Sequence, residues 1–299
     1  MHTSSLEQFL ANTRPALAMC VAGIVILVVG LWAAKKDIAR ASGLDKIVAL
    51  SNLSFAVPLA VFGALHVAGP EFVASIVPPY MMWPMFWAYF VGVALLAASL
   101  SIATKIEVRW SGLLLGIMLL LFVVMLDIPA VLATPGERIN WTLTIRELSF
   151  AAGGWIFAGD ALRAKGGRKL IIVGRVLIAI AALFFGVEHF LHPLGRPGVP
   201  LEKLTPEWIP GRLLIGYLTG AILVAAGVCL LVAKKTRLAA TCLGTWILLL
   251  VVFVYGPILI AALLDPSIGA KVEGINYFAD TLFFGGAILA LASASPRTD

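Results

Sequence analysis

Long apolar runs separated by short polar segments make up most of the chain. Nine of these runs approach the about 20 residues that a helix needs to cross a bilayer. Nearly every position inside a run is apolar, so run length rather than periodicity predicts the helices. The predicted membrane spans cover residues 16–34, 47–68, 84–103, 110–132, 142–162, 170–191, 212–233, 238–264 and 275–293.

Composition supports a chain embedded in a lipid bilayer. Of the 299 residues, 61% are hydrophobic and only 13% are charged, whereas roughly a quarter of the residues of a soluble domain are charged. Too few charges are present to cover a soluble globule of this size. We therefore exclude a soluble enzyme, a disordered chain and a secreted disulfide scaffold, and predict an all-α polytopic membrane protein.

The connections between the predicted spans alternate in charge, and this alternation predicts an orientation. Basic connections face the cytoplasm, so we expect a multi-pass protein of the cell's inner (cytoplasmic) membrane with its N-terminus outside and its C-terminus inside. The net charge of +6 is spread over these connections, which argues against a nucleic-acid partner. The basic residues follow the first, third, fifth and seventh spans: Lys35, Lys36, Arg40 and Lys46; Lys105 and Arg109; Arg163, Lys165, Arg168 and Lys169; Lys234, Lys235 and Arg237.

Short motifs recur in one order at an interval of about 125–130 residues. They predict one N-terminal helix with its cytoplasmic loop (1–46), followed by two pseudo-symmetric four-helix units (47–165 and 166–299). Parallel repeats of this kind are related by an axis along the membrane normal. The matched motifs are Phe62–His66 with Phe185–His189, Pro79–Pro84 with Pro206–Pro210, Tyr89–Gly92 with Tyr217–Gly220, Asp127–Pro129 with Tyr255–Pro257, and Gly153-Gly154 with Gly285-Gly286.

These motifs resemble the DoxX-like family of four-helix membrane units. The second unit is the closer match; the first lacks the arginine and the Thr-Arg pair. The resemblance implies a membrane protein, and for some members a subunit of a thiosulfate:quinone oxidoreductase or a partner in oxidative-stress complexes, hence a possible redox partner subunit. The residues of the second unit that carry it are Arg175, Phe184-Phe185-Gly186, His189, Pro206–Pro210, Gly220 and Thr236-Arg237.

Most ionisable and phenolic groups within the spans are predicted to lie in one layer near the extracytoplasmic face. Buried ionisable groups in a membrane are costly, so each is a candidate for a functional position. The inner half holds little that is comparable, apart from Asp160 near the cytoplasmic end of the fifth span. The candidate ligand-binding residues are His66, Tyr89, Asp127, Arg146, Glu147, Glu188, His189, Tyr217, Tyr255 and Asp280.

The residue types in this layer leave several functions open. The layer could be a structural polar network that joins the two units. It could bind a quinone, since histidine and tyrosine donate to quinone carbonyls and carboxylates supply protons. His66 and His189 could ligate a haem, and His189 and His192, with Glu188 or Glu71, could hold zinc or copper. A vestibule for a small solute is the remaining alternative.

Quinone-linked redox chemistry is the leading functional hypothesis. The alternative is a non-enzymatic membrane protein whose polar layer is structural or binds a partner or small ligand. Two outer connections could cover the layer: a short interfacial helix over Glu71–Trp83 and the Pro- and Gly-rich stretch Leu194–Gly211.

Overall fold

The structure, a computed structural model, describes residues 5–162 and 166–296, and long helices make up most of it. Within these residues, eight helices are long and apolar enough to cross a membrane, by length and composition. The chain is therefore a multi-pass helical membrane protein, as its composition predicts. Arg163 and Lys165, two of the predicted basic residues after the fifth span, lie outside the described residues.

Each of the nine predicted spans coincides with a helical segment, although the span 212–233 extends two residues past the end of α10. The predicted span 142–162 lies in α8, which is long enough to cross a bilayer but is not among the eight apolar helices. Arg146, Glu147 and Asp160 make α8 less apolar. The segments are α1 (Ser5–Arg40), α2 (Asp45–Val48) with α3 (Ser51–Ala68), α5 (Pro84–Thr104), α6 (Val108–Phe122) with η1 (Val123–Asp127) and α7 (Ile128–Ala133), α8 (Arg138–Leu162), α9 (Gly167–Leu191), α10 (Arg212–Leu231), α11 (Thr236–Leu250) with η2 (Val251–Tyr255) and α12 (Gly256–Leu264), and α13 (Ile268–Ala294).

Two π-helical turns, η1 and η2, interrupt otherwise continuous spans. Each is followed by a proline near the start of the next helical piece, Pro129 in α7 and Pro257 in α12. Proline has no backbone N–H and cannot make the usual bond to the carbonyl four residues earlier. The wider π turn lets the helix continue past this missing bond. As a result Asp127 and Tyr255 each end a π turn in corresponding places of the chain.

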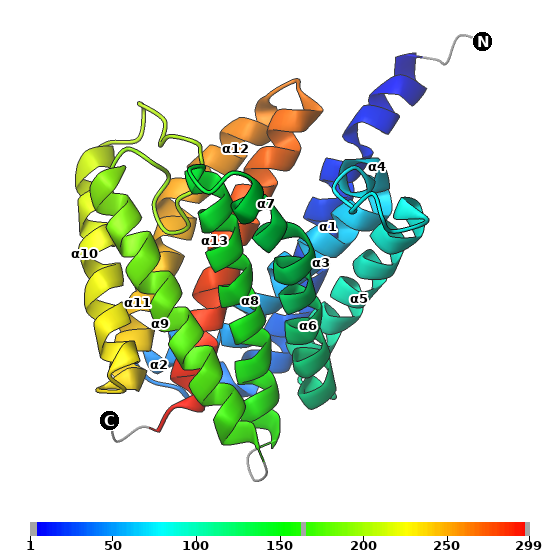
Figure 1. The fold of residues 1–299 in the computed structure, drawn as a ribbon. Coiled ribbons are helices and arrows are strands. Elements are labelled where there is room, and N and C mark those ends of the chain that lie inside the picture. Colours follow the sequence, from blue (N-terminus) through cyan, green and yellow to red (C-terminus); the bar gives the residue numbers. More distant parts are fainter. Residues whose placement is uncertain (1–4, 163–165, 297–299) are drawn as a thin grey trace.

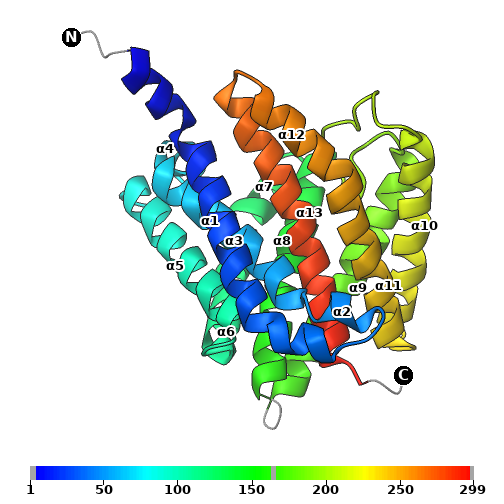
Figure 2. The same cartoon turned by 180° about the vertical axis from the view of Figure 1, so that it is seen from behind.

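Four helices, α3, α8, α9 and α13, make the contacts between the two halves of the bundle, and α8 and α9 lie on the face seen in Figure 1 (Figures 1 and 2). In the first half, α3 to α8, the helix α5 packs on α3 and α6 packs on α8. In the second half, α9 to α13, α10 packs on α9 and α11 packs on α13. The halves meet where α13 contacts α3 and α8 and where α8 contacts α9; we call this contact the seam. Helix α1 packs outside the seam, mainly on α3.

Small residues and aromatic rings fill the seam. The ring centroids of Phe55 and Phe283 lie 4.4 Å apart, and those of Phe150 and Phe283 lie 4.2 Å apart. A Cβ on Gly286 would lie 2.5 Å from the backbone nitrogen of Phe55, and one on Gly153 would lie 2.3 Å from the Phe55 ring. Glycine at these positions therefore lets α3, α8 and α13 approach closely.

Several contacts recur in the two halves. His66 Nδ1 lies 2.8 Å from the Phe62 carbonyl oxygen, and His189 Nδ1 lies 2.5 Å from that of Phe185. Near the opposite ends of α3 and α9, Asn52 donates to the carbonyl of Ile102 and Arg175 donates to that of Leu230, at the ends of α5 and α10. Gly63 faces Gly92 as Gly186 faces Gly220. The pairs Gly153-Gly154 and Gly285-Gly286, which the sequence matches to each other, differ in their contacts. Gly154 faces Gly112, whereas Gly285 faces Ile247.

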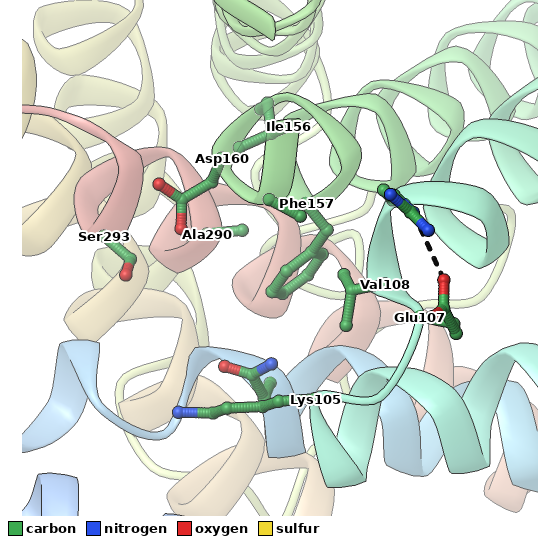
Figure 3. Close-up of a pocket in the computed structure, with 11 residues that line it drawn as sticks. Lys105, Glu107, Val108, Ile156, Phe157, Asp160, Ala290 and Ser293 are labelled. Carbon is green, nitrogen blue, oxygen red and sulfur yellow. Dashed lines mark hydrogen bonds and ion pairs between the residues drawn. The ribbon is translucent and has the colours of Figure 1, made fainter. Parts of the chain in front are cut away.

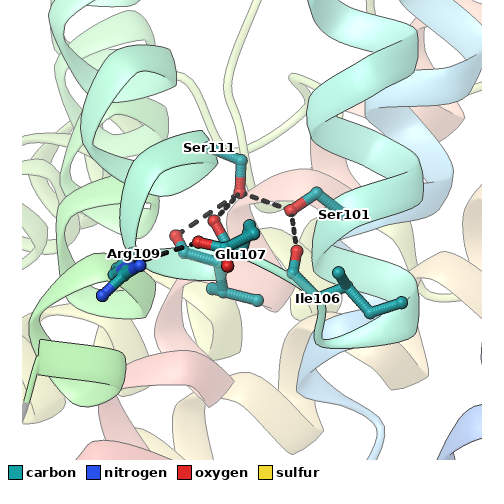
Figure 4. Close-up of polar contacts among 6 residues, drawn as sticks. Ser101, Ile106, Glu107, Arg109 and Ser111 are labelled. Carbon is teal, nitrogen blue, oxygen red and sulfur yellow. Dashed lines mark hydrogen bonds and ion pairs between the residues drawn. The ribbon is translucent and has the colours of Figure 1, made fainter.

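The bundle has two ends of different character. We call the end where α3 and α9 finish the histidine end, and the opposite one, with the α5–α6 and α10–α11 turns, the basic end (Figure 1). At the α5–α6 turn, Lys105 and Glu107 have positive φ angles, and the Ser101 hydroxyl hydrogen-bonds the Ile106 carbonyl and the Ser111 hydroxyl (Figure 4). These bonds fix a tight reversal between α5 and α6.

The connections after α3 and α9, at the histidine end, differ from the predicted interfacial helix and lid. In the first, the helix α4 spans only Pro70–Ala74, so the prediction of a helix over Glu71–Trp83 is wrong for its second part. Pro78 and Pro79 interrupt the backbone hydrogen bonding there, and Tyr80 and Trp83 are exposed. The second connection enters the bundle, as described below.

A methyl group at Gly286 tests the packing of the seam. We expect Gly286→Ala to lower the midpoint of thermal unfolding in detergent, because its Cβ collides with the backbone of α3; overpacking of this kind costs about 1–3 kcal/mol. The matched control is Gly136→Ala, where a Cβ meets no atom within 4 Å. Equal midpoints for the two variants would contradict the close approach of α3 and α13.

Candidate functional site

A charged cluster lies across the seam in the half of the bundle nearer the histidine end. Arg146 on α8 donates from Nη1 to Oδ2 of Asp280 on α13 over 3.1 Å. Its Nη2 lies 3.6 Å from Oε2 of Glu147, and Asp127 at the end of η1 interacts with it electrostatically. The guanidinium also lies over the Phe150 ring, 5.7 Å from its centroid. Four of the predicted site residues are therefore brought together.

The cluster is enclosed by protein. Side-chain exposure is 21% for Arg146, 14% for Glu147 and 8% for Asp280. Removing one partner of an ion pair held this far from water destabilises the fold when the remaining charge stays buried without compensation. We call Arg146, Glu147, Asp280 and Asp127 the seam cluster.

A second ion pair crosses the seam between α8 and α9. Arg138, in the first turn of α8, donates from Nη1 to Oε2 of Glu188 over 3.0 Å. The same guanidinium donates to the carbonyls of Pro200 and Leu201, at 2.8 and 3.1 Å. Arg138 thus connects α9 and the connection that follows it to the start of α8.

The connection after α9 folds back into the bundle as a re-entrant loop, residues 195–201, whose residues are all buried. A bridge between Gly195 and Leu204 closes its base. Two of its residues are prolines, which carry no N–H that would need a partner inside the protein. Gly198 has φ +104°, and a Cβ there would lie 3.1 Å from Thr281 Cγ2. Glycine is therefore required where the loop touches α13.

His189 and Tyr255 hold this re-entrant loop in place. The backbone N–H of Gly198 donates to His189 Nε2 over 3.0 Å, so Nε2 carries no proton and Nδ1 donates to the Phe185 carbonyl. The Tyr255 hydroxyl donates to the Pro197 carbonyl over 2.8 Å. Both predicted site residues thus bind backbone of the re-entrant loop.

The histidine geometry bears on the haem and metal alternatives. Both ring nitrogens of His189 are hydrogen-bonded to backbone, and ligation of iron or zinc would have to break one of these bonds. His192 caps α9 and is not part of the helix, because its peptide turns away before Pro193. Across the described residues, no group of three or more His, Cys, Asp or Glu side chains is placed to hold a metal ion. The Nδ1 atom of His66 bonds the Phe62 carbonyl, and in the described part of the chain no hydrogen bond or ion pair joins the His66 ring to the seam cluster.

Tyr89 and Tyr217 lie on the outer surface of the bundle. They are 44% and 42% exposed, and the Tyr217 ring packs against Phe190 with centroids 6.2 Å apart. Neither side chain contributes to the seam cluster. The structure therefore separates these two tyrosines from the carboxylates with which the sequence groups them.

Arg196 in the re-entrant loop is a buried cation that the sequence analysis missed. Its guanidinium lies 4.1 Å from the centroid of the Tyr277 ring, and Nη2 lies 3.9 Å from Oε1 of Glu273. Arg138 was missed as well, since both arginines lie in segments assigned to connections outside the membrane. The available signal was the composition of 195–201, where one charge stands among Pro, Gly, Val and Leu.

Buried polar atoms without a hydrogen-bond partner gather around α13 in this layer. Such atoms cost free energy unless a partner is supplied. Thr142 and Asn276 lie one helical turn before Arg146 and Asp280, on the same faces of α8 and α13. The atoms are Thr142 Oγ1, Arg146 Nε, Asn276 Oδ1, and Arg196 Nε and Nη1.

A pocket of about 600 Å³ lies at the basic end, away from this layer (Figure 3). Three charged residues of the pocket already form ion pairs. Arg109 Nε bonds Glu107 Oε2 over 3.2 Å, and Lys105 bonds Asp37. Asp160, predicted to be interfacial, lies on its wall. The lining residues are Asn52, Lys105, Glu107, Val108, Arg109, Ile156, Phe157, Asp160, Ala161, Ala290 and Ser293, and they include none of the predicted site residues.

Removing the Tyr255 hydroxyl tests how the re-entrant loop is held. We expect Tyr255→Phe to lower the thermal unfolding midpoint and to expose 195–201 to protease, because a buried acceptor left without its donor costs about 1–3 kcal/mol. The control is Tyr217→Phe, whose hydroxyl lies at the exposed surface. If both variants behave like the parent protein, the Tyr255–Pro197 bond does not hold the loop.

Comparison of the chain with protein-family models, with curated proteins and with solved structures finds no match.

Proposed function

We propose that the chain crosses the cytoplasmic membrane nine times, with the N-terminus outside and the C-terminus inside. The ninth span is α8, whose charged residues face α9 and α13 rather than lipid. The recurring contacts of His66 and His189, and of Asn52 and Arg175, support two related DoxX-like four-helix units after an N-terminal helix.

Within this architecture, the protein is non-enzymatic, and the ion pairs of its polar layer stabilise the packing of the two units against each other. The observation that carries this proposal is that two buried ion pairs both cross the seam. Arg146 of the first unit binds Asp280 of the second, and Arg138 of the first binds Glu188 of the second. In a lipid environment, where apolar contacts alone give little preference for one helix partner, such polar contacts specify the partner.

Quinone-linked redox chemistry draws less support from this geometry. His189 is engaged by backbone at both ring nitrogens, and Tyr89 and Tyr217 lie on the outer surface. A quinone in the layer would need donors that these residues do not supply in this arrangement.

Neutralising one partner of each ion pair tests the stabilising role. We expect Asp280→Asn and Glu188→Gln each to lower stability without any added ligand, by about 1–3 kcal/mol, since each removes the carboxylate that accepts a hydrogen bond from a partly buried arginine. The readout is thermal unfolding of the full chain in detergent. The matched control is Glu107→Gln, which breaks an exposed pair and should cost below about 1 kcal/mol.

A short-chain benzoquinone provides the opposing arm of this test. The proposal predicts no shift in the unfolding midpoint of the parent protein when it is added. A saturable rise that Glu188→Gln and Asp280→Asn abolish, without loss of stability in the ligand-free variants, would support the quinone site and contradict the stabilising role.

Labelling from outside intact cells tests the orientation. In a chain with Cys20, Cys229 and Cys242 replaced by alanine, a membrane-impermeant maleimide should react with Gly136→Cys at the histidine end. Lys234→Cys at the basic end should react only after the cells are permeabilised. The reverse pattern would show that the positive-inside prediction is inverted.

A further inference from the structure

The charges of the seam cluster do not balance. Asp127, Glu147 and Asp280 are three carboxyl groups, and the cation that they share in the described part of the chain is Arg146, which forms ion pairs with Glu147 and Asp280 and interacts with Asp127 at longer range. With every carboxyl ionised, the cluster would hold two uncompensated negative charges within a membrane-embedded bundle. Buried charge of this kind is relieved most readily when a carboxylate takes up a proton.

The geometry indicates which carboxyl groups share the arginine least. Asp280 accepts a hydrogen bond from Arg146 at 3.1 Å and so retains its negative charge. Glu147 lies farther from the guanidinium, at 3.6 Å, and Asp127 interacts with the guanidinium electrostatically at longer range. The excess negative charge therefore falls on Glu147 and Asp127.

One unpartnered acceptor near the cluster needs a hydrogen donor. The amide oxygen of Asn276, one turn before Asp280 on α13, accepts no hydrogen bond. The unpartnered hydroxyl of Thr142, fully buried one turn before Arg146 on the same face of α8, can donate as well as accept and does not distinguish a carboxylate from a protonated carboxyl. A protonated carboxyl has an O–H to donate, directly or through water, whereas a carboxylate has none.

The charged and titratable groups around the cluster come from α8, η1, α13 and η2. Helix α8 contributes Arg146, η1 contributes Asp127 and α13 contributes Asp280. The Tyr255 hydroxyl from η2 lies within electrostatic range of Asp280 and of Arg196 in the re-entrant loop. Asp127 is partly exposed at the end of a π turn, whereas Asp280 is buried.

We propose that Glu147 and Asp127 form a proton-binding site that holds an exchangeable proton beside the Arg146–Asp280 ion pair. This site goes beyond the proposed role in joining the units, which requires only the Arg146–Asp280 and Arg138–Glu188 ion pairs. Its ligand is the proton itself, taken up from and returned to the extracytoplasmic side. Buried carboxylates are the usual groups for such exchange in membrane proteins.

Infrared spectroscopy of the full chain in lipid at neutral pH tests the proposal. The parent protein should show a protonated-carboxyl C=O band that shifts in deuterium oxide. Asp127→Asn/Glu147→Gln should lose that band, since each substitution replaces a carboxyl by a neutral group of the same shape. Glu107→Gln, which alters an exposed carboxylate at the basic end, should keep it.

A parent protein without the band, or a band that survives in the double variant, would overturn the proposal. The parent measurement does not depend on the folding of any variant. Either result leaves the seam ion pairs as they are, because their role is judged by the stability of Asp280→Asn.

Discussion

A guanidinium buried in a helical membrane bundle cannot remain unpaired, and this requirement organises the histidine-end half of the seam. Arg146 lies on α8 over the ring of Phe150, with most of its side chain buried, so its charge has to be met by protein. Asp280, on the partner helix of the other half, meets it directly. The packing of α8 against α13 is thereby fixed in register as well as in distance, since a shift of one residue would separate the two charges.

The two halves share helices, turns and capping contacts, yet they differ where the second connection enters the bundle. Tyr255 and His189 bind the backbone of the re-entrant loop, which fills the histidine end of the second half. In the first half the residue at the end of the corresponding π turn is Asp127, and the connection after α3 stays largely at the surface. The charged residues of the seam cluster thus belong mostly to the half without such a loop. The first half therefore carries acidic residues where the re-entrant loop fills the second half.

The sequence predicts the helices well, because run length is a direct consequence of bilayer thickness. It also predicts that Asp127, Arg146, Glu147 and Asp280 lie at one depth, and the structure brings them together. Depth alone does not tell which way a side chain points around a helix. The sequence therefore groups Tyr89 and Tyr217 with the cluster, although both side chains face outward. The sequence does not predict the burial of Arg196 for a different reason: a Pro- and Gly-rich segment has no periodicity from which burial could be inferred.

The central claim is that the Arg146–Asp280 pair couples the two units. A double-mutant cycle with Arg146→Gln and Asp280→Asn measures this coupling from the unfolding free energies of the parent, both single variants and the double variant. The account predicts a strong interaction, on the order of 2–3 kcal/mol, with the double variant far less damaged than the sum of the two single losses. Additive losses would contradict it, since they would mean that the two side chains do not act on each other across the seam.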